Sequence, residues 1–120
     1  MPRYISFMLT QDQIRARTKT VTRRLGWKNL KPGTLLMGAE KCQGLGKGGK
    51  IKPLGLIRVV HVRREPLRRM VEDTAYGYAE TQAEGFPGRS PQGFIGFFCK
   101  SHKGCTPDSE VTRIQFEYVT

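Results

Sequence analysis

The sequence predicts a single α+β domain, in which a small mixed or antiparallel sheet curls into a barrel with short helices at its ends. Strand-like segments lie at both ends and in the middle of the chain, and helix-like segments are inserted between them. The length of 120 residues fits one domain over residues 1–120. The hydrophobic fraction of 38% is that of a folded chain with one modest core.

The N-terminal third begins with a short predicted strand at residues 4–8. Residues 10–13 then have the form of a capping box, in which the Thr10 hydroxyl accepts from the backbone N–H of Gln13 and the Gln13 side chain reaches back. A helix is therefore expected from about residue 11 to 17. The following segment, residues 19–24, has alternating β-branched side chains, which favour an extended strand.

The middle third contains two predicted strands and a loop. The turn signal at residues 31–33 leads into an apolar strand at 34–41, and the Gly-rich stretch at 43–53 reads as a loop or hairpin tip. The Val-rich run at 54–64 is the strongest strand candidate. Pro66 ends it and opens a helical turn through residue 69, and a helix weakened by Gly77 is expected at 72–83.

The C-terminal third is predicted to hold one helix and a final strand. After a turn at residues 84–88, Ser90 and Pro91 form an N-cap and first-turn pair. Three phenylalanines then follow at helical spacing on one face, up to about Lys100. Residues 111–119 alternate as in a half-buried strand, with Arg113 on the face opposite Ile114.

The charge balance favours a polyanionic partner. The chain carries 21 Lys and Arg against 10 Asp and Glu, a formal net charge of +11 that is concentrated in residues 1–31, 41–52 and 58–69. Such a field attracts nucleic acid, although a basic surface tuned for solubility has the same composition.

No apolar run reaches the ~18 residues of a membrane span, and the first residues do not resemble a secretory signal. Together with an odd number of cysteines, this predicts a cytoplasmic protein with thiols and no membrane association.

The segment at residues 19–24, Lys-Thr-Val-Thr-Arg-Arg, packs three cations and two hydroxyls together. Hydroxyl and guanidinium groups are the groups that hold phosphates and base edges. A turn at either end of the segment would bring Lys19 towards Thr22, and a partly buried lysine can act as a base on a hydroxyl. The alternative is a solvated basic strand.

The order of the motifs resembles the ASCH (activating-signal-cointegrator homology) domain, a relative of the PUA domain. The resemblance covers nearly the whole chain and rests on residues 19–24, 30–34, 62–67, 84–86, the Phe-rich helix and residues 111–118. It looks most like the small stand-alone members of bacterial and phage genomes. It implies a PUA-like β-barrel with flanking helices, an association with RNA, and a cleft floored by residues 19–24 and Glu84.

The resemblance also implies possible chemistry. Some family members resemble an amidohydrolase that removes acetyl from N4-acetylcytidine, and Lys19, Thr22 and Glu84 match its catalytic set. Others are linked to cleavage of single-stranded RNA. In such a set Lys19 would take the Thr22 proton, and Thr22 would attack the acetamide carbonyl. Glu84 would protonate the leaving amine, and Arg23 or backbone N–H groups would hold the oxyanion. The alternative for Glu84 is an ion pair with Arg24 or Lys19.

Two regions depart from the compact amidohydrolase pattern: the Gly- and Lys-rich stretch at 43–53 and the tail from Cys99 to Cys105. The double arginine of residues 23 and 24 favours a nucleotide or RNA over a neutral nucleoside. The expected ligand-binding residues are Thr20, Arg23, Arg24 and two aromatic side chains that could stack on a base, Trp27 and Phe86. The alternative for these two is a place in the core.

Cys99, His102 and Cys105 form a C-x2-H-x2-C pattern to which Cys42 could add a fourth ligand. The spacing is unusual for zinc, so thiols and a surface histidine are favoured, and no metal or cofactor is expected. The sequence thus predicts a protein that binds RNA or a modified nucleotide in a basic cleft. A hydrolase acting in that cleft and an adaptor domain without chemistry are the alternatives.

Overall fold

The computed structural model describes residues 2–42, 45–46 and 48–119. The elements in these residues are β1 (Arg3–Ser6), α1 (Gln11–Arg15), β2 (Val21–Arg24), β3 (Leu35–Ala39), β4 (Pro53–Pro66), α2 (Arg69–Glu72), α3 (Thr74–Ala83), α4 (Pro91–Lys100) and β5 (Glu110–Tyr118). Of the predicted loop at 43–53, positions 43, 44 and 47 lie outside the described residues. The described positions of this loop that precede β4, residues 45–46 and 48–52, form no helix or strand.

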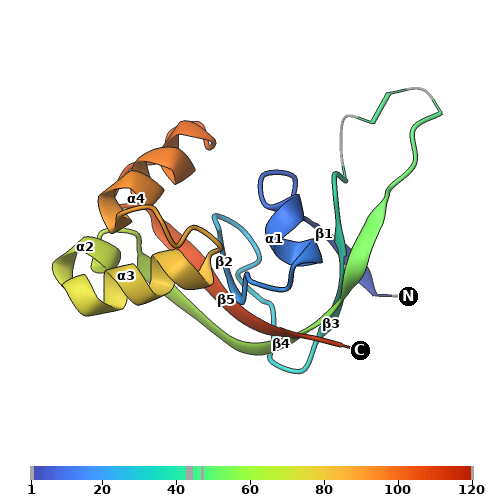
Figure 1. Cartoon of the computed structure of the whole chain (residues 1–120), viewed down its shortest axis with the longest axis horizontal. Coiled ribbons are helices and arrows are strands. Elements are labelled where there is room, and N and C mark those ends of the chain that lie inside the picture. Colours follow the sequence, from blue (N-terminus) through green and yellow to red (C-terminus); the bar gives the residue numbers. More distant parts are fainter. Residues whose placement is uncertain (1, 43–44, 47, 120) are drawn as a thin grey trace.

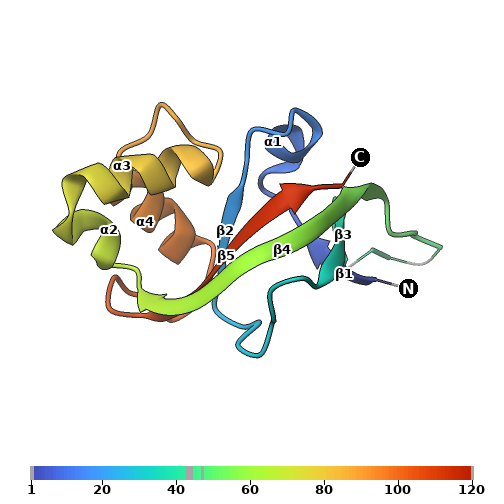
Figure 2. The ribbon, with the colours of Figure 1, turned by 90° about the horizontal axis from the view of Figure 1, so that it is seen from below.

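The five strands form one mixed sheet in the order β1-β3-β4-β5-β2. Only the β1–β3 pair is parallel, and the other three pairs are antiparallel. The strand β4, 14 residues long, pairs with β3 along its first part and with β5 along the rest, so it links the two halves of the sheet. Figures 1 and 2 show that the sheet is strongly curled into a half-barrel. The predicted α+β, PUA-like class is thereby confirmed.

The helices lie in two places against the sheet. Figure 1 shows α2, α3 and α4 gathered at one end, while α1 lies against the inside of the curl. Each end has its own buried core. The first contains Ile5, Phe7, Ile14, Leu36, Ile57, Val59, Ile114 and Phe116. The second joins the helices to β5 and contains Leu67, Met70, Phe94, Ile95, Phe98 and Val111. The site described below lies where the two cores meet.

The start of α4 follows the sequence prediction. The Ser90 hydroxyl accepts from the backbone N–H of Gly93 at 3.0 Å, and Pro91 occupies the first turn. Gly77, in contrast, is not a weak point of α3. A Cβ there would stand 1.8 Å from the carbonyl oxygen of Met70, so the absence of a side chain is what lets α2 and α3 pack.

Two local predictions were wrong. Thr10 lies at the N-cap of α1, but its side chain makes no capping hydrogen bond, and α1 ends at Arg15. The Gln13 side chain donates instead to the carbonyl oxygen of Gly85 at 3.3 Å, because the turn after α3 packs on α1. Arg113, expected on the face of β5 opposite Ile114, is buried with 7% exposure because Glu80 of α3 pairs with it. Gln115 and Glu117 on the same face are exposed.

None of the helices in the described residues is long and apolar enough to cross a bilayer.

Candidate functional site

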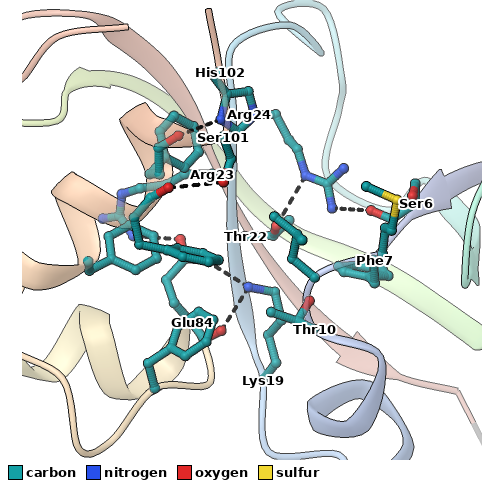
Figure 3. A pocket seen from close by; sticks show the side chains of 16 residues that line it. Ser6, Phe7, Thr10, Lys19, Thr22, Arg23, Arg24, Glu84, Ser101 and His102 are labelled. Atoms are coloured by element: carbon teal, nitrogen blue, oxygen red, sulfur yellow. Dashed lines mark hydrogen bonds and ion pairs between the residues drawn. The ribbon is translucent and has the colours of Figure 1, made fainter.

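A pocket of about 240 Å³ opens between β2, the loop after β1 and the helix α4 (Figure 3). One wall is polar and comes from residues in and just before β2, together with Glu84. The other wall is aromatic and comes from the turn after α3 and from α4. The pocket is lined by Ser6, Phe7, Met8, Leu9, Thr10, Lys19, Thr22, Arg23, Arg24, Glu84, Phe86, Phe94, Phe97, Phe98, Ser101 and His102.

The side chains of Lys19 and Glu84 meet at the floor of this pocket. Lys19 Nζ lies 2.7 Å from Glu84 Oε1 and also donates to the Glu84 carbonyl oxygen at 2.8 Å. Both side chains are 3% exposed. Gly85, with φ of +101°, provides the turn that ends α3 and holds Glu84 here. Burial is the main influence on the Lys19 ammonium and lowers its pKa below the ordinary value, although the Glu84 carboxylate opposes this.

Arg23 lies at the centre of a buried cluster of charges. Its Nη1 donates to Glu84 Oε2 at 3.0 Å. Its Nη2 donates to Glu80 Oε1 at 2.6 Å, to Glu65 Oε2 at 3.2 Å and to the Tyr76 hydroxyl at 3.2 Å. The Arg23 side chain is fully buried. Burial alone would lower its pKa, but the carboxylates of Glu84 and Glu80 outweigh this effect and raise it. The positive charge of Arg23 is therefore already balanced by carboxylates within the protein.

The strand register explains why Glu80 is needed. Arg23 of β2 lies directly opposite Arg113 of β5, and two like charges in this position repel each other. Glu80 of α3 accepts hydrogen bonds from both guanidinium groups. These hydrogen bonds lower the pKa of Glu80 to about 2 against the effect of burial, so it stays ionised at neutral pH. The cluster fixes the position of β2 and of Glu84.

Arg24 has different surroundings from Arg23. Its Nε donates to Thr22 Oγ1 at 3.2 Å, and its Nη2 donates to the carbonyl oxygen of Ser6 at 2.6 Å. The second bond joins the two edge strands, β2 and β1, across the open side of the half-barrel (Figure 3). Among the described residues no carboxylate forms an ion pair with Arg24, and burial lowers its pKa to about 10.

The structure brings together Lys19, Thr22, Glu84, Arg23, Arg24 and Phe86 from the predicted set. It places Thr20 and Trp27 elsewhere. The Thr20 side chain is exposed, and its backbone donates to the Ala83 carbonyl. Trp27 packs against the first core, with the Arg3 guanidinium 4.5 Å from its ring centre. No hydrogen bond in the described part of the chain joins Lys19 Nζ to Thr22 Oγ1.

Sequence reasoning missed most of the aromatic wall. Phe94, Phe97 and Phe98 were recognised as one helix face, but their place in the site depends on how α4 packs. The Phe86 ring packs against the rings of Phe94 and Phe97, with its centre 6.1 and 5.2 Å from theirs. The His102 ring stacks on Phe98 at 4.2 Å and extends this wall. Nothing in the spacing of the sequence motifs indicated that residues 6–10 would also line the pocket.

The cysteine and histidine pattern forms no metal centre in the described residues, where no group of three or more His, Cys, Asp or Glu side chains is placed to hold an ion. Cys42, Cys99 and Cys105 are free thiols. Cys99 and Cys105 are neighbours, with their sulfurs 2.8 Å apart.

The curled five-stranded mixed sheet with its short helices has a PUA-like fold. No protein-family model matches the sequence, and no curated protein matches it. Solved structures do match over nearly the whole chain. The ASCH domain from Lactobacillus crispatus JV V101 has a TM-score of 0.62 at 15% identity, covering 97% of this chain and 78% of that one.

Two further structures are similar to the same degree. Protein EF3133 from Enterococcus faecalis V583, of family DUF984, has a TM-score of 0.64 at 19% identity and covers 99% of this chain and 80% of that chain. The hypothetical protein PH0355 has a TM-score of 0.63 at 17% identity, and the match covers 98% of this chain and 97% of that chain. The chain thus has the fold of an ASCH domain, and the resemblance of its motifs is confirmed at the level of the fold.

Proposed function

We propose that the protein binds a nucleotide, free or as one residue of single-stranded RNA, in the pocket between β2 and α4. The observation that carries the proposal is the pairing of a cationic wall with an aromatic wall. A cavity of about 240 Å³ has the volume of about eight water molecules in the liquid, which is enough room for one nucleobase. A base would stack on the phenylalanine rings, and its phosphate would lie towards Arg24.

The different surroundings of the two arginines support this assignment of roles. Arg23 already has three carboxylate partners, so a phosphate would gain little from it. Arg24 is held in the pocket wall by two hydrogen bonds to neutral oxygens, and burial disfavours its charge. An anionic ligand would restore a favourable environment for that charge. The exposed side chains of Met8 and Leu9 lie on the pocket rim, where an adjacent base could pack.

Binding of a short labelled single-stranded RNA, with a nucleoside monophosphate as competitor, tests the proposal. Phe97→Ala is expected to weaken binding roughly 5- to 150-fold, because stacking on one aromatic ring is typically worth ~1–3 kcal/mol per base. Tyr78→Ala is the matched control, since Tyr78 is 53% exposed on α3 and does not line the pocket. Equal affinities for wild type and both variants would remove the pocket as the binding site and favour the adaptor alternative.

Hydrolysis is a second candidate, because Lys19, Thr22 and Glu84 line one pocket. Transfer of one proton from Lys19 Nζ to Glu84 Oε1, 2.7 Å away, would turn the ion pair into a neutral amine and a carboxylic acid. Burial lowers the pKa of the Lys19 ammonium, which favours its loss of this proton. The amine would then take the Thr22 proton as Thr22 Oγ1 attacks an acetamide carbonyl, and the acid would protonate the leaving amine. Water would release acetate from the acylated Thr22 and restore its hydroxyl.

Incubation with N4-acetylcytidine, and separately with single-stranded RNA, distinguishes hydrolysis from binding alone. If the pocket is catalytic, Thr22→Ala and Lys19→Ala are each expected to lower turnover at least 100-fold, and the loss of affinity in Thr22→Ala is expected to be much smaller than its loss of turnover. Product from wild type and both variants at equal rates would exclude this catalytic set.

A further inference from the structure

The segment that joins α4 to β5 carries two cysteines next to the pocket. Cys99 Sγ and Cys105 Sγ lie 2.8 Å apart, and both side chains pack partly buried against the second core. The backbone between them is already folded into turns. The His102 N–H donates to the Cys99 carbonyl at 3.3 Å, and the Cys105 N–H donates to the His102 carbonyl at 3.2 Å.

We propose that Cys99 and Cys105 are a site of reversible oxidation, at which a small-molecule disulfide oxidant forms an intramolecular disulfide bond. A disulfide needs a sulfur separation of about 2.05 Å. The two sulfurs therefore have to approach by only about 0.8 Å from their present 2.8 Å. The partial exposure of both thiols allows an oxidant such as oxidised glutathione to reach them.

The order of the exchange follows from the two thiols. Burial, together with the adjacent Cys105 thiol, raises the pKa of Cys99 to about 12, so Cys105 is the first nucleophile. The Cys105 thiolate attacks oxidised glutathione, and one glutathione leaves. Cys99 then loses its proton and attacks Cys105 Sγ in the mixed disulfide, which releases the second glutathione. Two protein thiols are oxidised, one glutathione disulfide is reduced, and the two thiol protons end on the two glutathione molecules.

Two of the residues enclosed by this bond line the pocket. Ser101 and His102 lie between the two cysteines, and both line the pocket (Figure 3). His102 Nδ1 is 2.7 Å from the carbonyl oxygen of Phe98, so the segment is attached to the aromatic wall. The disulfide would fix the segment in its pocket-lining conformation. The effect on ligand affinity, unlike formation of the bond, rests on the proposed function.

Tryptic mass spectrometry of the whole protein tests formation of the bond without any ligand. Trypsin cuts after Arg89, Lys100, Lys103 and Arg113, so Cys99 and Cys105 fall on the separate peptides 90–100 and 104–113, and Cys42 falls on 42–47. After treatment with oxidised glutathione and alkylation without reduction, peptides 90–100 and 104–113 are expected to be joined. Cys42→Ser is expected to keep the link, and Cys105→Ser to abolish it.

Free alkylated thiols, stable glutathione adducts or links to Cys42 would each overturn the proposal. Slower hydrogen exchange at the His102 and Cys105 amides of the oxidised wild type is the expected second readout, and unchanged exchange would contradict it. RNA affinity is expected to rise roughly three- to tenfold on oxidation, because two pocket side chains are ordered beforehand. If the disulfide forms and the RNA affinity stays unchanged, only the proposed effect of the disulfide on affinity is overturned. If the reduced protein binds no RNA, the proposed function is overturned instead.

Discussion

Replacing Arg23 with alanine is expected to lower the free energy of unfolding by about 3–5 kcal/mol, which is typical when one partner of a buried ion pair is removed. The side chain is fully buried and is hydrogen-bonded to Glu65, Glu80 and Glu84. Without it, three carboxylates with at most 7% exposure lose a cationic partner. Urea denaturation followed by circular dichroism measures the change.

Arg58→Ala provides the control for this experiment. It removes the same charge, but Arg58 pairs with Glu117 on the surface, where both side chains are about half exposed. Such pairs contribute about 0–1 kcal/mol. A loss from Arg23→Ala no larger than that from Arg58→Ala would show that the buried cluster adds little to stability.

The pH dependence of the wild-type protein tests the same cluster even if Arg23→Ala fails to fold. The pKa of Glu80 falls from 4.5 to about 2 in the folded state, and that of Glu65 is also lowered. A lowered carboxyl pKa gives stability that is fully present above the unfolded value and is lost as the pH falls towards the folded value. Wild-type stability should therefore decline between about pH 5 and pH 2. A midpoint of urea unfolding that stays constant over this range contradicts the prediction.

The parts of the fold that the sequence predicted are those specified by neighbouring residues. The strand at β2 follows from its β-branched residues, and α4 follows from Ser90, Pro91 and the spacing of its phenylalanines. The capping box at Thr10 failed although its residues were suitable. Gln13 found a partner 72 positions away in Gly85, and a tertiary contact took precedence over a local one.

Part of the lining of the candidate pocket was predicted, but the different roles of its residues were not. Lys19, Thr22 and Glu84 do share a pocket, as the motifs implied. The different roles of Arg23 and Arg24 depend on which side chains of α3 and β4 lie next to β2. Glu80 and Glu65 are separated from Arg23 by 57 and 42 positions, and local patterns carry no information about such pairs. The register of β2 against β5 would have placed Arg113 opposite Arg23 and indicated that an acidic residue must pair with both.

Replacing Arg24 with alanine is expected to weaken binding of single-stranded RNA roughly 10- to 150-fold, because a hydrogen bond to a charged group contributes about 1.5–3 kcal/mol. Arg24 is held in the pocket wall, and its burial leaves its charge underpartnered until an anion binds. The slope of log affinity against log salt should fall by about 0.7, the value for one phosphate contact on a single strand.

Arg58→Ala again supplies the comparison, because it lowers the net charge equally but does not line the pocket. If the general field of a chain with net charge +11 carried the binding, the two variants would lose similar affinity and similar salt dependence. If the pocket carries it, Arg24→Ala should lose much more than Arg58→Ala, and Arg24→Lys should recover part of the loss. Lysine restores the charge but not the planar donors that reach Thr22 and Ser6. Equal behaviour of the alanine variants would place RNA on the surface and leave the pocket without a role in binding it.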